Sequence, residues 1–222
     1  MRLYQNSTCL LLIVGVVSAG CLCGQAPATP ASEAKGMPPR TSPGEYQAQA
    51  QVGTVTVAGE FTGHAVPTAD GDPLSTDDYI VVEVAFFGPP EARIKLSLED
   101  FSLRINTKKA PLPSEPSEVV FKSLKDPQWA PPKTESKSKT SIGGGGGGQN
   151  EGNSPPPVVH IPIELRRSMQ QRVQKVSLLL GDRALPQAGL VFFSYHGKTD
   201  GLSSVDLIYN GPAGKATLAL QR

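Results

Sequence analysis

Residues 79–87, YIVVEVAFF, decide the fold class of this chain. Every side chain on one face of this segment, from Ile80 to Phe86, is apolar. Apolar residues at every second position indicate a β-strand with a buried face. The strand must end at Gly-Pro-Pro, residues 88–90, because proline has no N–H group to donate to a neighbouring strand.

Short segments with similar patterns recur along the chain. We expect further strands within the ranges 52–61, 94–98, 101–106, 119–121, 190–193, 204–209 and 218–220. Polar residues alternate with the apolar ones in most of them, which is typical of antiparallel strands that expose one face to water. About eight short strands separated by turn residues predict a mainly β protein in which two antiparallel sheets form a sandwich.

One segment has a helical period instead. Leu165, Met169, Val173 and Val176 recur at intervals of three and four residues, which predicts a helix over 164–176, closed by Gly181-Asp182. We expect its apolar stripe to pack on the sheet. The alternative is that its basic face, which includes arginines, rests on anionic lipid headgroups.

Four segments together resemble the immunoglobulin-like accessory domains of bacterial lipoproteins and secreted proteins. They are residues 79–87, 100–105, 189–193 and 205–209. The resemblance implies an immunoglobulin-like antiparallel β-sandwich that acts as a scaffold or interaction module, and it brings no catalytic residues. The helix and a glycine-rich insertion depart from the plain sandwich.

The N-terminus carries the features of an export signal. An apolar core, residues 9–17, follows a single basic residue, Arg2, and the uncharged stretch from Thr8 to Gly24 is shorter than the about 20 residues of a membrane-spanning helix. We expect a signal peptide over residues 1–23, with a retained single-pass anchor as the alternative. All three cysteines lie in these residues, so the domain that follows must be held by a hydrophobic core rather than by disulfides.

The site of cleavage has two interpretations. Ser18-Ala19-Gly20-Cys21 resembles the lipobox of bacterial lipoproteins, in which the cysteine is acylated and becomes the new N-terminus. That resemblance makes Cys21 a candidate for lipidation, which would anchor the protein to a membrane. A simple secretory cut within residues 19–26 would release the protein instead. Either outcome places it outside the cytoplasm.

Two stretches have the composition of disordered chain. Residues 24–50 are rich in proline, alanine and serine and predict a flexible tether. A low-complexity insertion at 130–157 includes six consecutive glycines, Gly143–Gly148, and lacks the Gly-Lys-Ser/Thr ending of a phosphate-binding loop. We therefore expect one β-sandwich domain over residues 51–222, interrupted by this insertion.

The charge balance argues against a nucleic-acid partner. The full chain has 21 basic and 20 acidic residues, and removal of Arg2 with the signal leaves a neutral protein. Such a protein has no overall field to attract nucleic acid or anionic lipid.

No residue pattern predicts catalysis or a cofactor. His64, His160 and His196 have no second ligand at metal-binding spacing, and no serine lies in a Gly-x-Ser-x-Gly elbow. The densest group of oxygen ligands comprises Asp70, Asp72, Asp77 and Asp78. These carboxylates form a candidate calcium site, with a plain turn as the alternative, because Asp and Gly are also common turn residues.

Three functions remain open at this stage. The favoured one is a non-enzymatic, exported interaction or scaffold module that binds another protein of the cell envelope. The second is a carbohydrate- or calcium-binding module that uses the loop acids with Trp129 and Tyr195. The third, a hydrolase assembled from scattered residues, has the least support in the sequence.

Overall fold

The computed structural model describes residues 36–69, 71–107, 110–130 and 161–221, all within one compact unit, Lys35–Arg222. Several predicted features lie outside the described residues: the signal peptide with Cys21, residues 24–35 of the tether, Asp70, His160 and almost all of the insertion at 130–157. None of the helices in the described part of the chain has the length and apolar character needed to cross a bilayer.

The described residues form mostly strands. The strands are β1 (Ala48–Val52), β2 (Val55–Gly63), β3 (Ala65–Val66), β4 (Leu74–Thr76), β5 (Tyr79–Phe87), β6 (Arg93–Leu96), β7 (Phe101–Ile105), β8 (Leu112–Glu115), β9 (Leu124–Lys125), β10 (Gly181–Ala184), β11 (Gln187–Ser194), β12 (Val205–Gly211) and β13 (Gly214–Gln221). The helices are α1 (Ser117–Val120) and α2 (Ile163–Val176), with short 3₁₀ turns at Pro43–Glu45, Leu98–Asp100 and Thr199–Gly201.

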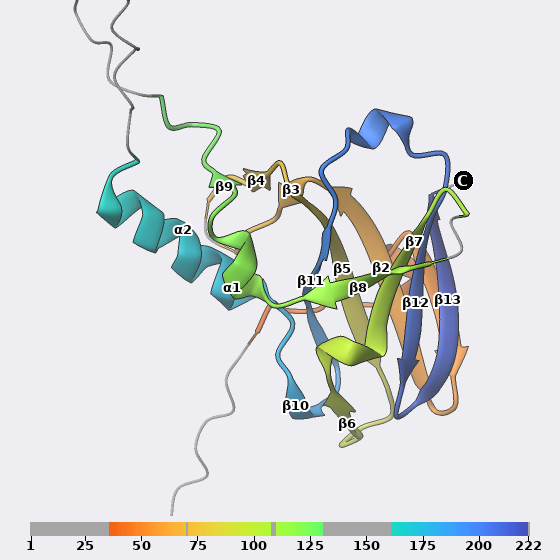
Figure 1. The fold of residues 1–222 in the computed structure, drawn as a ribbon. Coiled ribbons are helices and arrows are strands. Elements are labelled where there is room, and N and C mark those ends of the chain that lie inside the picture. Colours follow the sequence, from red (N-terminus) through yellow and green to blue (C-terminus); the bar gives the residue numbers. More distant parts are fainter. Residues whose placement is uncertain (1–35, 70, 108–109, 131–160, 222) are drawn as a thin grey trace, which may run out of the picture. The chain divides into compact units, whose positions relative to one another are not determined.

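Eight strands join into one antiparallel sheet in the order β1-β2-β5-β11-β8-β7-β12-β13. The sheet curls until β13 lies against β1 and β2, so that it is nearly a barrel (Figure 1). The prediction of a mainly β, antiparallel fold is therefore confirmed. The two-sheet, immunoglobulin-like sandwich is not confirmed, because alternation specifies which face of a strand is buried but not how many sheets the strands share.

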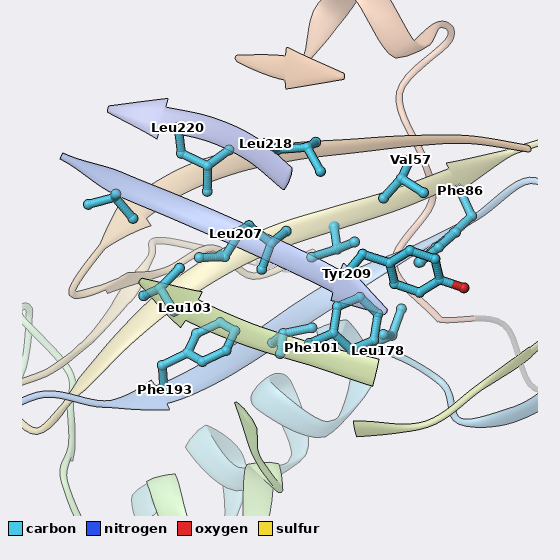
Figure 2. Close-up of a cluster of buried hydrophobic side chains, with 14 of the residues drawn as sticks. Val57, Phe86, Phe101, Leu103, Leu178, Phe193, Leu207, Tyr209, Leu218 and Leu220 are labelled. Atoms are coloured by element: carbon cyan, nitrogen blue, oxygen red, sulfur yellow. The ribbon is translucent and has the colours of Figure 1, made fainter. Parts of the chain in front are cut away.

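The inside of the curled sheet is filled by side chains. The apolar face of β5, from Ile80 to Phe86, meets residues of β12 and β13 such as Leu207 and Leu220 (Figure 2). The rings of Phe86, Phe101 and Tyr209 lie 5.4–6.0 Å apart, at angles of 47–73°. Such edge-to-face and tilted contacts are favourable for aromatic pairs. The interior is thus a packed core.

The outer face of the same strands carries a second core. Val81 of β5 and Phe192 of β11 point outward and pack against Met169, Val173 and Val176 of α2. The predicted helix is confirmed to within one residue at its start, and it packs on the sheet through the stripe that the sequence indicated. Because β5 and β11 are covered on both faces, both are almost continuously buried.

Residues 36–50 correct the predicted tether. Met37 pairs with Ala188 of β11, a 3₁₀ turn follows at Pro43–Glu45, and Ala48–Val52 forms the strand β1. Low hydrophobicity suggested disorder, but this segment is held by backbone pairing and by one buried aromatic side chain, Tyr46. Alanine and glutamine alternate in β1 because only one of its faces, that of Ala48, Ala50 and Val52, packs against the core.

Two further predictions are wrong. Residues 119–121, expected as a strand, belong to α1 and the turn after it, since a short apolar run fits either a strand or a buried helical turn. Gly181-Asp182, expected to close the helix, begins β10, which pairs with β6. The helix itself ends at Val176, where the next residue, Ser177, adopts extended backbone.

Candidate functional site

The end of α2 is fixed against β11 by an unusually close backbone approach. Ser177 forms a parallel bridge with Leu190, and the N–H of Leu178 donates to the Leu190 carbonyl at 3.0 Å. Gly189 makes this approach feasible, because a Cβ there would lie 2.3 Å from the Leu178 Cα. Leu178 then reaches the interior core, so that α2 is attached to the sheet at its C-terminal end.

α1 lies beside α2 and is fixed by its own buried residue. Val120 is fully buried in the outer core, and its carbonyl accepts a hydrogen bond from the Ser123 hydroxyl at 3.0 Å. That hydroxyl also lies 2.7 Å from the hydroxyl of Thr76 in β4. α1, α2 and the chain to Leu180 together present one surface, which we call the α1–α2 face (Figure 1).

One hollow of about 210 Å³ lies at the C-terminal end of α2 on this face. Its apolar lining includes Leu178, Leu190 and Phe192, and its two charged residues are Glu115 and Glu118. The described residues that line it include no lysine or arginine. We call it the acidic hollow.

A second hollow of about 370 Å³ lies along the N-terminal half of α2. Phe121, Leu124 and Met169 supply its apolar lining, and its charged residues are Lys122 and Arg166. No carboxylate is among the described residues that line it. We call it the basic hollow, because its charged side chains are positive whereas those of the acidic hollow are negative.

The large apolar side chains that are exposed among the described residues all belong to this face. Val119 is 37% exposed on α1, Ile163 is 64% exposed at the start of α2, and Leu180 is 41% exposed in the acidic hollow. Single exposed apolar residues are ordinary, but all three lie on the segments that form this face, which also has two hollows with mainly apolar linings. This combination marks a candidate contact surface.

The predicted calcium ligands have separate partners. Asp72 accepts a hydrogen bond from the Gln128 amide, Asp77 pairs with Lys125, and Asp78 lies 3.0 Å from Nδ1 of His196. Among the described residues no group of three or more His, Cys, Asp or Glu side chains is arranged to hold a metal ion.

The other residues singled out in the sequence have structural contacts. Both ring nitrogens of His64 lie within hydrogen-bond distance of backbone carbonyls, at 2.7 Å from Tyr79 and 2.9 Å from Gly197. The Tyr195 ring stacks on His64 with 6.3 Å between ring centres. Neither His196 nor Asp78, both exposed to solvent, lines a hollow described here.

Sequence reasoning missed a buried charged cluster on the outer face of β5. Glu83 is 3% exposed and is paired in register with Glu60 of β2. Arg40 forms ion pairs with both carboxylates, at 3.2 Å from Glu83, and its guanidinium lies 4.6 Å from the centre of the Tyr46 ring. The signal in the sequence was one carboxylate in the middle of an apolar strand.

This cluster holds residues 36–47, which we call the strap, against the sheet. One carboxylate oxygen of Glu83 has no hydrogen-bond partner among the described residues. The positive charge of Arg40 is therefore the main stabilising interaction of this buried carboxylate. Burial raises the pKa of Tyr46 to about 12, and the nearby Glu83 carboxylate acts in the same direction. Its side chains contact one another between the strap and the sheet, which favours a structural role for the cluster.

Comparisons with protein-family models, with curated proteins and with solved structures find no match to this chain.

Proposed function

We propose that this chain is a non-enzymatic interaction or scaffold module of the bacterial cell envelope, which binds a protein in the same compartment through the α1–α2 face. The observation that carries the proposal is that the exposed large apolar side chains of the described residues, Val119, Ile163 and Leu180, all lie on the face that has the two hollows. Burying these side chains against a partner would release the water that now covers them, which is the main driving force for protein association.

The chemistry of the face suits a protein partner better than a small ligand. The linings of its hollows are mainly apolar with a few charged residues, a combination also found in the cores and rims of protein interfaces. The resemblance to immunoglobulin-like accessory domains agrees with this role. We also propose that the fold is the immunoglobulin-like sandwich that this resemblance implies, with the opposite sides of the curled sheet as its two layers.

The location is part of the same proposal. An export signal at residues 1–23 would deliver the domain outside the cytoplasm, either anchored by lipid on Cys21 or secreted. The intact mass of the mature protein tests this step. A mass with diacylglycerol on an N-terminal Cys21 supports the anchored form, an unmodified chain cut within residues 19–26 supports secretion, and an uncut chain in the cytoplasm contradicts both.

Site-specific photocrosslinking in living cells tests the interaction. A photoreactive amino acid would replace Ile163 or Val119 in the full chain, with Gln49 on the exposed side of β1 as the matched control. We expect discrete protein adducts from positions 163 and 119 and none from position 49. Equal labelling at all three positions, or no adduct at 163 and 119, would contradict the proposal.

A further inference from the structure

Four charged side chains on the α1–α2 face have no ion-pair partner within the described part of the chain. They are Glu115 and Glu118 at the acidic hollow, and Lys122 and Arg166 at the basic hollow. Other charged residues nearby are already paired: Arg172 with Asp126, and Arg167 with Glu164. Lys175, which follows Gln174 of the acidic hollow in the sequence, also has an interaction partner.

The unpaired charges are separated along α2. The acidic hollow includes Gln174 and Ser177 at the end of the helix, whereas the basic hollow includes Arg166 and Gln170 in its first half. A helix of 14 residues is about 21 Å long, so the face has an acidic end and a basic end. Exposed apolar residues occur at both ends, with Leu180 at the acidic end and Ile163 at the start of the helix.

We propose that the partner bound by the α1–α2 face is a second copy of this chain, related by a two-fold axis that sets the acidic hollow of each copy against the basic hollow of the other. This inference rests on the proposed function, since it requires the face to be an interface. A two-fold interface uses the same patch on both subunits and must be self-complementary. A face with opposite charges at its two ends meets that condition, because rotation by half a turn exchanges the ends.

The helix orientation agrees with this pairing. A two-fold axis perpendicular to α2 makes the two α2 helices antiparallel. The partial positive charge at the N-terminus of each helix then lies beside the partial negative charge at the C-terminus of the other. Val119, on α1 between the two hollows, is placed to contact its own copy near the axis.

The contact area is small, so the dimer is expected to be weak. One helix of 14 residues and one of four give less surface than the roughly 800 Å² per partner of a standard stable interface. We therefore expect association that depends on protein concentration. It should weaken at high salt, which screens the attraction between the acidic hollow of one copy and the basic hollow of the other.

Sedimentation analysis of the purified full chain tests the inference through two charge reversals, Glu118→Lys and Arg166→Glu. Both side chains are exposed, so both variants should fold. Each variant alone sets like charges against each other in a two-fold dimer, and we expect its dissociation constant to rise about tenfold. An equal mixture of the two variants restores opposite charges at both contacts, and we expect it to dimerise as the unaltered protein does.

The matched controls are Glu91→Lys and Lys215→Glu, which reverse exposed charges away from this face and are expected to leave dimerisation unchanged. A chain that stays monomeric at all concentrations, a dimer unaffected by the reversals, or a mixture that fails to recover would each overturn the inference. Crosslinking at Ile163 separates its failure from that of the proposed function. Adducts exclusively with a different protein overturn only the second-copy inference, whereas the absence of any protein adduct overturns both.

Discussion

The inner and outer faces of the curled sheet differ in what they bury. The inner face encloses apolar side chains and the ring of Tyr209, whose hydroxyl accepts a backbone N–H from Ala213 at 3.5 Å. The outer face carries the fully buried α2 contacts, the charged pair Arg40–Glu83 and two hollows. Stability draws on both faces, since the outer face also has a buried core, but the proposed binding surface lies on the outer cover alone.

The largest effect is expected from truncation inside the sheet. Phe86→Ala would remove a fully buried ring that contacts both Phe101 and Tyr209. We expect a loss of about 3–5 kcal/mol in the free energy of unfolding, measured by urea denaturation. A loss below about 1 kcal/mol would show that the inner face is not the main source of stability.

Removal of the charge that compensates Glu83 comes next. Arg40→Met leaves the buried Glu83 carboxylate beside Glu60 without its positive partner. We expect the free energy of unfolding to fall by about 2–3 kcal/mol, which is less than for a fully buried ion pair because Arg40 is partly exposed. The double variant Arg40→Met with Glu83→Gln should recover most of that loss, since no buried charge remains. Losses that simply add would indicate that the two residues are not coupled.

Gly189→Ala tests the attachment of α2 to the sheet. The added Cβ would meet the Leu178 backbone at 2.3 Å, so either β11 or the residues after α2 must move, at a cost of about 1–3 kcal/mol. Gly201→Ala is the matched control, because no atom of the described part of the chain lies within 4 Å of a Cβ there. Similar thermal unfolding of both variants would contradict the close approach.

The smallest effect is confined to alkaline solution. Tyr46 has a pKa of about 12 in the folded protein against 10.0 for an ordinary tyrosine. A folded-state pKa that is raised stabilises the fold below pH 10, and this contribution is lost as the pH rises from 10 towards 12. We expect Tyr46→Phe to flatten the stability profile in that window. An unchanged alkaline profile would show that the strap does not bury the phenol.

Local patterns predicted most of the strong elements. β5, β7 and β12 were predicted from period-two alternation, and α2 from its helical stripe, because each has one clearly apolar face. β8 was missed because its four residues include Pro113, and proline argues against a strand at the level of sequence. The strap was missed because its order comes from contacts with residues distant in sequence, such as Glu83 and Ala188.

The candidate site was harder to predict than the fold. Glu118, Lys122 and Arg166 are ordinary surface residues in the sequence, and only the packing of α1 beside α2 brings them onto one face. The acids that did attract notice, Asp72, Asp77 and Asp78, have separate partners. Spacing along the chain identifies sites whose residues are local, and this face is assembled from segments that are far apart.

Hydrogen–deuterium exchange at low and high protein concentration tests the association surface most directly. We predict that slower exchange at high concentration is confined to peptides covering residues 115–124 and 163–180, while the β12–β13 hairpin exchanges equally at both concentrations. Unchanged exchange in both α-helical peptides, or protection that appears on the hairpin instead, would contradict the assignment of binding to the α1–α2 face.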